Sequence, residues 1–155
     1  MSFFYGVTDE NFKLTLGNKR YLDNDRPVYE NTSVKLVAAK NDTAVFQIVL
    51  KSEQPYLLNV SEQPVFSRKG SREVYRLAAD SGKLALSLFP IGMMQDNQNN
   101  YQADVLLRYP VLEVEEDTPV SVWAEITIPS DTPAGEYRGS VTIYKSRMFE
   151  DETAV

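Results

Sequence analysis

The sequence contains neither cysteine nor histidine among its 155 residues. Without cysteine the chain has no disulfide bond, no thiol nucleophile and no cysteine metal site. Without histidine it lacks the side chain that most often acts as a general base and as a zinc ligand. Carboxylates, lysine, tyrosine and hydroxyl groups remain as conceivable catalysts. We therefore expect no cofactor and no metal centre.

Positive charge and long apolar runs are also scarce. Sixteen lysines and arginines stand against 22 acidic residues, which gives a net charge of −6 and a pI near 4.7. This balance opposes attraction to nucleic acid and to anionic lipid. No apolar stretch approaches the ~20 residues of a membrane span, and residues 1–6 do not form a signal peptide. We expect a soluble chain, either cytoplasmic or secreted with its leader missing.

The clearest pattern in the sequence is an alternation between residues 120 and 128. Ser121, Trp123, Glu125 and Thr127 occupy one parity, and the opposite parity is aliphatic throughout: Val120, Val122, Ala124, Ile126 and Ile128. A period of two residues is typical of a strand with one buried face. The sequence predicts that this aliphatic face lies in the core and that Trp123 points away from it.

A proline-bounded loop, Pro129–Gly135, ends this strand, because proline cannot donate to a ladder and glycine can adopt positive φ. A second strand is predicted from Tyr137 to Tyr144, with Tyr137, Val141 and Ile143 on one parity and Tyr144 on the other. The two strands form either an antiparallel pair in one sheet or two strands in facing sheets. The sequence leaves both arrangements open.

Further short strands are separated by turn signals, and no convincing amphipathic helix is present. The predicted strands are 12–16, 33–39, 44–50, 56–60, 65–66, 73–79, 83–89 and 111–115. The near-continuous apolar run 44–50 predicts a strand buried on both faces, and residues 40–43 and 80–82 are predicted turns. About nine or ten antiparallel strands predict an all-β fold, an immunoglobulin-like or galactose-binding-like β-sandwich. We expect one sandwich domain over residues 1–145 and an acidic tail or linker start over 146–155.

Three stretches together resemble a known family. They are LVAAKNDTAVFQIVL (36–50), YQADVLLRYPVLEV (101–114) and VWAEITIPSDTPAGEYRGSVTIY (122–144). The most specific piece is the tryptophan strand followed by the proline-bounded loop and Ala-Gly-x-Tyr-x-Gly. These stretches resemble the N-terminal β-sandwich of glycoside hydrolase family 123-like proteins, and the resemblance covers roughly residues 34–145.

The resemblance implies that a TIM-barrel hydrolase domain follows such a sandwich and holds the catalytic Asp-Glu pair. This sequence contains no barrel, so the expected partner is a missing C-terminal catalytic barrel domain. Acidic clusters at 9–10, 115–117 and 150–152 match no catalytic position of that family, and neighbouring residues on a strand point to opposite faces. The polar tract 96–100 fails the EF-hand calcium pattern. We assign no catalytic residue.

Trp123 is the most informative candidate, and Tyr144 shares its ambiguity. An aromatic ring on the outer face of a strand can stack on a sugar, contact another domain or pack beneath the N-terminal aromatics. The first hypothesis is a non-catalytic accessory N-terminal domain that packs against and shapes the barrel of a glycoside hydrolase. The alternatives are an autonomous carbohydrate-binding module with a glycan as partner, and an immunoglobulin-like structural or adhesion domain.

Overall fold

The computed structural model describes residues 3–9, 15–17, 20–21, 32–61, 73–80, 82–95, 101–106 and 111–146. Within these ranges the chain forms eleven strands, no helix, and two sheets. The strands of the larger sheet are β1 (Phe3–Asp9), β2 (Thr15–Gly17), β3 (Arg20–Tyr21), β4 (Thr43–Ser52), β7 (Ala85–Gln95), β8 (Tyr101–Leu106) and β10 (Val120–Thr127). Those of the smaller sheet are β5 (Tyr56–Asn59), β6 (Glu73–Asp80), β9 (Val111–Val114) and β11 (Ser140–Ser146).

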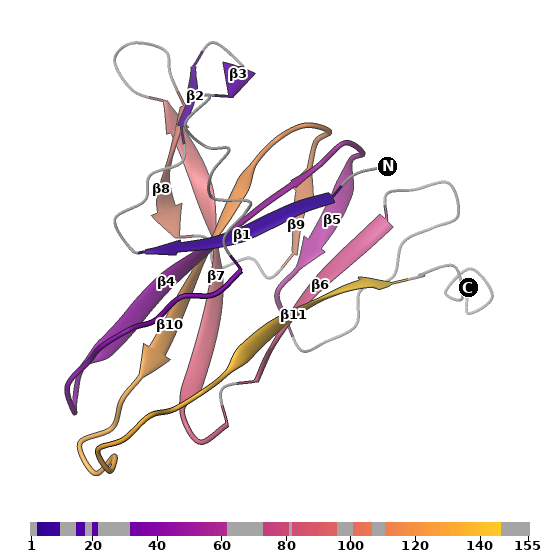
Figure 1. The fold of residues 1–155 in the computed structure, drawn as a ribbon. Coiled ribbons are helices and arrows are strands. Elements are labelled where there is room, and N and C mark those ends of the chain that lie inside the picture. Colours follow the sequence, from indigo (N-terminus) through magenta and orange to yellow (C-terminus); the bar gives the residue numbers. More distant parts are fainter. Residues whose placement is uncertain are drawn as a thin grey trace.

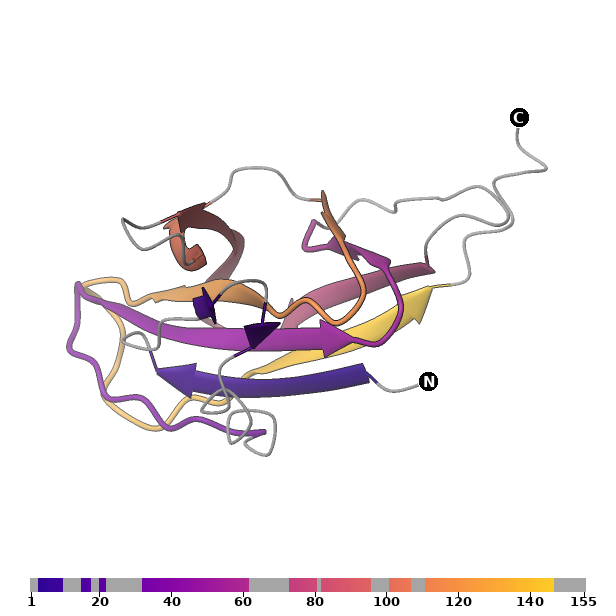
Figure 2. The ribbon, with the colours of Figure 1, turned by 90° about the horizontal axis from the view of Figure 1, so that it is seen from above.

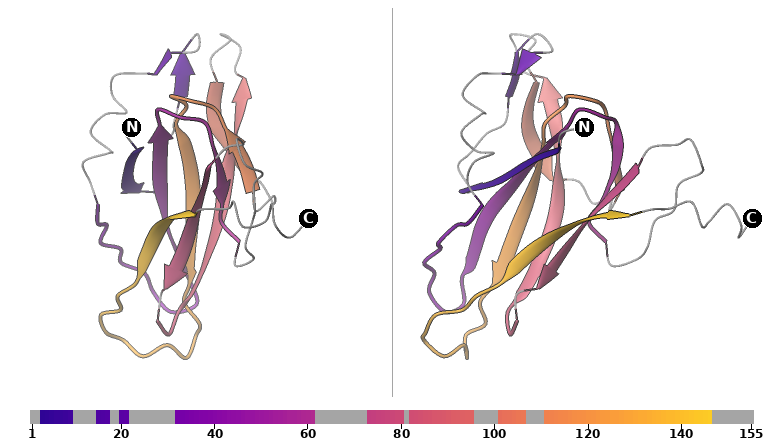
Figure 3. Two further views of the ribbon diagram at one scale, coloured as in Figure 1. Left: turned by 90° about the vertical axis from the view of Figure 1, so that its right-hand side faces the viewer. Right: turned by 45° about the vertical axis from the view of Figure 1, so that its right-hand side comes forward.

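The two sheets form the two layers of a β-sandwich (Figure 1). The strand order is β1-β4-β10-β7-β8-β2-β3 in the larger sheet and β11-β6-β5-β9 in the smaller. Side views show the smaller sheet stacked beside the larger one (Figure 3). The predicted all-β sandwich is thereby confirmed. One pairing departs from the antiparallel expectation, because β5 and β6 run parallel.

The two strands that flank the proline-bounded loop lie in different sheets. β10 pairs with β4 and β7 in the larger sheet, whereas β11 pairs with β6 in the smaller. The loop therefore crosses from one layer to the other, which decides between the two arrangements that the sequence left open. β11 begins at Ser140, three residues later than predicted, and Tyr137 stays in the loop.

The core lies between the inner faces of the two sheets. The aliphatic parity of β10 points into it as predicted, and Val122 and Ala124 are fully buried. β4 is buried on both faces, as its near-continuous apolar run predicted, with Ile48 in the core and Val49 on the opposite side. The core residues are Phe46, Ile48, Leu50, Tyr56, Leu58, Tyr75, Leu77, Val114, Val120, Val122 and Ala124.

The predicted strand at residues 33–39 is wrong, since this segment joins neither sheet. Only Leu36 packs against the core, and Val37 is 96% exposed. Alternating residues alone do not make a strand, because a strand also needs a neighbour whose backbone groups complete the ladder. The turn that follows is as predicted, with Asn41 at a φ of 62°.

Two other predictions need correction. The aromatic N-terminus forms β1, an edge strand paired with β4, where the sequence had suggested no strand. The strand predicted to end at Phe89 continues to Gln95. Pro90 lacks an N–H to donate, and β7 changes neighbour there, pairing with β10 up to Pro90 and with β8 from Ile91.

Several predictions fall outside the described residues. These are the start of the first strand at 12–14, the strand at 65–66, the polar tract 96–100 and most of the tail at 146–155.

Candidate functional site

Trp123 lies on the outer face of the larger sheet. Its parity is opposite to that of Val122 and Ala124, which are buried in the core, and its side chain is half-buried. Its indole N–H donates a 2.8 Å hydrogen bond to the Glu125 carboxylate, two residues along the same face. Gln47 and Phe89 lie beside it on the neighbouring strands. The prediction that Trp123 points away from the core face is confirmed, and a carboxylate holds its ring in place.

On the same outer face, Ser121 and Gln47 form a buried polar contact. Ser121 donates a 2.6 Å hydrogen bond to Gln47 Oε1, and both side chains are almost wholly shielded from solvent. Gln47 Nε2 in turn donates to the backbone carbonyl of Asp9, which ties β4 to the end of β1. Buried polar groups need such partners. Ser121 lies on the parity opposite the core face and is nevertheless buried, so this part of the outer face is covered.

Tyr144 lies on the other side of the molecule. Ile143 packs toward the core, so Tyr144 faces outward from the smaller sheet, where it is 50% exposed and stands opposite Arg76 in the register. Trp123 and Tyr144 therefore occupy opposite outer faces of the sandwich. The two candidate contact residues cannot form one platform.

Among the N-terminal aromatics, Phe3 does not cover Trp123. Phe3 points into the core, where it stacks on Tyr75 with ring centroids 4.2 Å apart and meets the edge of Tyr56. Phe4 points outward, and the Lys51 ammonium lies 6.0 Å from the centre of its ring. Burial raises the pKa of Tyr75, and the nearby Lys145 ammonium partly opposes this rise. Lys145 is held 3.1 Å from Glu73.

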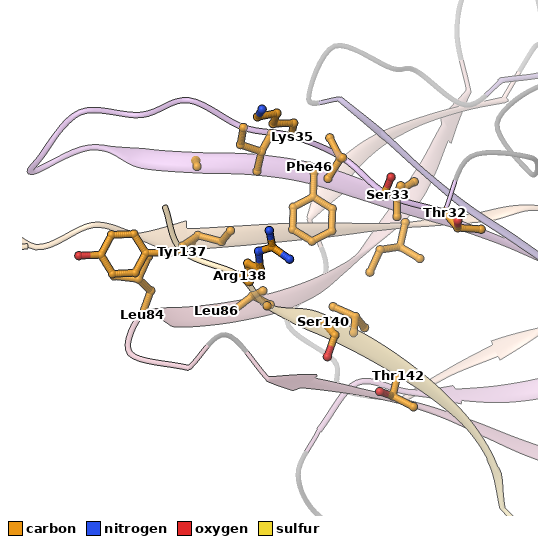
Figure 4. Close-up of a pocket in the computed structure, with 18 of the residues that line it drawn as sticks. Thr32, Ser33, Lys35, Phe46, Leu84, Leu86, Tyr137, Arg138, Ser140 and Thr142 are labelled. Atoms are coloured by element: carbon orange, nitrogen blue, oxygen red, sulfur yellow. The ribbon is translucent and has the colours of Figure 1, made fainter. Parts of the chain in front are cut away.

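An open groove runs between the two sheets along one side of the sandwich, with a volume of about 1330 Å³. One wall comes from β1 and residues 32–38, and the other from residues 135–143 at the start of β11. Figure 2 shows both segments on the same side of the molecule. In Figure 4, Phe46 lies near Ser33 of one wall, and Arg138 and Ser140 come from the other wall. Half-buried Leu86, Ile126 and Ile128 also line the groove.

No pattern in the sequence indicates this groove directly. Ile126 and Ile128 were assigned to the core by parity, and they do point inward, but they remain half-buried because the two sheets do not close over them. A side chain's direction follows from its own strand. The distance to the opposite layer depends on segments far away in the sequence, here residues 32–38 and 135–143.

Of the acidic clusters, the structure describes Asp9 and residues 115–117. Glu115, Glu116 and Asp117 occupy an exposed turn after β9, where Asp117 adopts a φ of 53° and its N–H bonds to the Ser52 carbonyl. Asp9 ends β1 at the edge of the larger sheet. Across the described ranges, no group of three or more acidic residues could hold a metal ion. The clusters at 150–152 lie outside those ranges.

Four chains of solved structures match this chain, and one of them has a described activity. The chain superimposes on the structure of a family 123 glycoside hydrolase from Clostridium perfringens, studied for the details of glycolipid glycan hydrolysis, with a TM-score of 0.65 and 16% sequence identity. The likeness is one of fold. The match covers 94% of this chain but only 25% of the enzyme chain, so this chain spans a quarter of the length of its neighbour.

The chain matches no protein-family model and no curated protein sequence. The fold likeness agrees with the resemblance that the three sequence stretches suggested. No helix among the described residues is long and apolar enough to cross a membrane.

Proposed function

We propose that this chain is a non-catalytic accessory domain of a larger glycoside hydrolase, which packs against a catalytic barrel and shapes its cleft. The observation that carries the proposal is the extent of the structural match. Nearly all of this chain superimposes on one quarter of a glycoside hydrolase. The chemistry of the larger enzyme would then reside in the part that this chain does not match.

Within this proposal, the contact surface is the outer face of the larger sheet around Trp123. The ring is half-buried, lies next to Phe89 and is oriented by Glu125, so it is already ordered before a partner arrives. Ordered aromatic side chains lose little conformational entropy on binding and are enriched at protein interfaces. Tyr144, on the opposite outer face, provides a matched control position.

The carbohydrate-binding alternative rests on the same residue. An indole beside a carboxylate combines a ring that can stack on a sugar with an acceptor for its hydroxyl groups. Two features favour the interdomain contact instead. The ring is half-buried rather than fully presented, and the Glu125 carboxylate already accepts the indole N–H.

Two experiments test the proposal. The coding sequence around these 155 residues should encode a barrel domain in the same reading frame. The purified chain should show no turnover of chromogenic N-acetylgalactosaminide or other chromogenic glycosides above buffer. Hydrolysis that disappears on replacement of a single carboxylate would overturn the non-catalytic assignment.

A further inference from the structure

The groove between the two sheets has apolar walls and a cationic rim, although the chain as a whole is acidic. We propose that it binds a long-chain amphiphile with an anionic head group, the tail lying between the sheets and the head at the rim. This site lies on the inner side of the sandwich, away from Trp123. The proposal is therefore independent of the accessory role.

The walls are made of core side chains that the sandwich leaves partly uncovered. Phe46 and Ile48 form the buried floor, and half-buried Leu86, Ile126 and Val141 flank it. Covering apolar surface that is in contact with water lowers the free energy, so a ligand that covers these side chains is favoured. A hydrocarbon tail meets this requirement without leaving any polar group unsatisfied.

The shape of the groove favours a long ligand. The stacked rings of Phe3 and Tyr75 stand at one end, whereas Leu84 and Ile128 line the other, where the strands lead into loops. Its volume of about 1330 Å³ exceeds the ~300–1,000 Å³ that is usual for compact small-molecule pockets. An extended chain uses such a slot better than a single sugar ring.

The charged side chains around the groove favour a head group that is anionic. The lining residues include three cations, Lys35, Arg138 and Lys145, and one anion, Glu136. Lys145 is paired with Glu73, so Lys35 and Arg138 are the cations that we assign to the head group. Lys35 and Arg138 come from opposite walls (Figure 4). Arg138 contacts Glu136 at 3.1 Å, but the two side chains are 88% and 72% exposed, and exposed pairs of this kind are weak. An anionic head can therefore compete for the guanidinium.

The test uses the purified chain and 11-(dansylamino)undecanoic acid, a carboxylate whose fluorescence rises in apolar surroundings. We expect saturable one-to-one binding that laurate displaces. Dodecanol, which has a tail of the same length without the charge, should displace the probe about tenfold less well.

Two sets of variants locate the site. Leu86→Trp fills the groove and should weaken probe binding by at least about tenfold, whereas Leu57→Trp, at a half-buried position that does not line the groove, should not. Lys35→Glu combined with Arg138→Glu should weaken laurate but not dodecanol. Lys51→Glu, outside the groove, is the matched charge control. The exposed charge variants keep the test valid if Leu86→Trp does not fold.

Three results would overturn the proposal. The first is the absence of saturable probe binding to the folded chain. The second is binding that neither Leu86→Trp nor the double charge reversal changes. The third is self-association, seen by light scattering, that Leu86→Trp abolishes while laurate has no effect on it, since the groove would then accommodate a second copy of the chain.

Discussion

The strand that carries Trp123 determines the direction of its side chain but not its burial or its hydrogen bond. The alternation of β10 sets its direction, and that part was predictable from sequence. Its half-burial and its bond to Glu125 depend on the neighbouring strands and on the rotamers of both side chains. These features favour a fixed contact residue over a freely presented sugar platform.

The fluorescence of Trp123, the only tryptophan in the chain, tests this interpretation. We expect no saturable change on titration with galactosaminide, glucan or chitin oligomers at millimolar concentration, because the ring is half-buried and its N–H is engaged. A saturable change, together with calorimetric binding that Trp123→Phe weakens and Tyr144→Phe does not, would make the chain a carbohydrate-binding module.

The buried hydrogen bond between Ser121 and Gln47 should contribute measurably to stability. Ser121→Ala removes the donor at 2.6 Å from a buried amide oxygen, and loss of such a partner costs about 1–3 kcal/mol in the free energy of unfolding. Thr127→Ala, at an exposed position on the same strand, should stay within about 0.5 kcal/mol. Equal losses in urea denaturation would mean that the outer face of β10 is open to water.

Tyr75 should make stability fall at high pH. Burial raises the pKa of its hydroxyl above the ordinary value of 10.0, so in alkaline solution the unfolded chain loses this proton first. The contribution of the protonated Tyr75 hydroxyl to the free energy of unfolding is therefore fully present below pH 10. It declines as the pH rises through 10 and above. Tyr75→Phe should show a smaller decline between pH 9 and 11 in denaturant titrations. Parallel curves for the two proteins would contradict the assignment.

At the scale of elements, segment 33–39 and β4 have similar apolar content but different environments. β4 has hydrogen-bonded neighbours on both sides, and the segment belongs to neither sheet. Alternation of apolar residues indicates which face of a strand would be buried. It does not indicate whether a neighbouring strand is present to pair with the segment.

Hydrogen exchange separates these two cases. Amides of residues 33–39 should exchange far faster than those of 45–50, since backbone groups outside a ladder open without unfolding the core. Protection of 33–39 equal to that of β4 would show that the segment pairs in solution, as its sequence pattern first suggested.

Sequence reasoning succeeded where local pattern determines the outcome. The inward parity of Val122 and Ala124, the double burial of β4 and the turn at Gly82, with a φ of 64°, all follow from a few adjacent residues. It failed where distant segments decide. The assignment of β10 and β11 to facing sheets, the parallel β5–β6 pair and the groove all depend on residues that are far apart in the chain.

At the scale of the whole molecule, the sandwich presents three separate surfaces. Trp123 lies on the outer face of the larger sheet, Tyr144 on the outer face of the smaller one, and the groove opens between them. Only the first is assigned to the barrel in the proposed function. This separation lets each role be tested by variants that leave the other surfaces unchanged.

The central claim is that this chain docks on a catalytic barrel through the Trp123 face. The most direct measurement is a calorimetric titration of this chain into the barrel that the proposal expects in the same reading frame, expressed separately. We expect saturable one-to-one binding, weakened at least about tenfold by Trp123→Ala and unchanged by Tyr144→Ala. Absence of binding by the folded chain, or equal effects of the two substitutions, would contradict it.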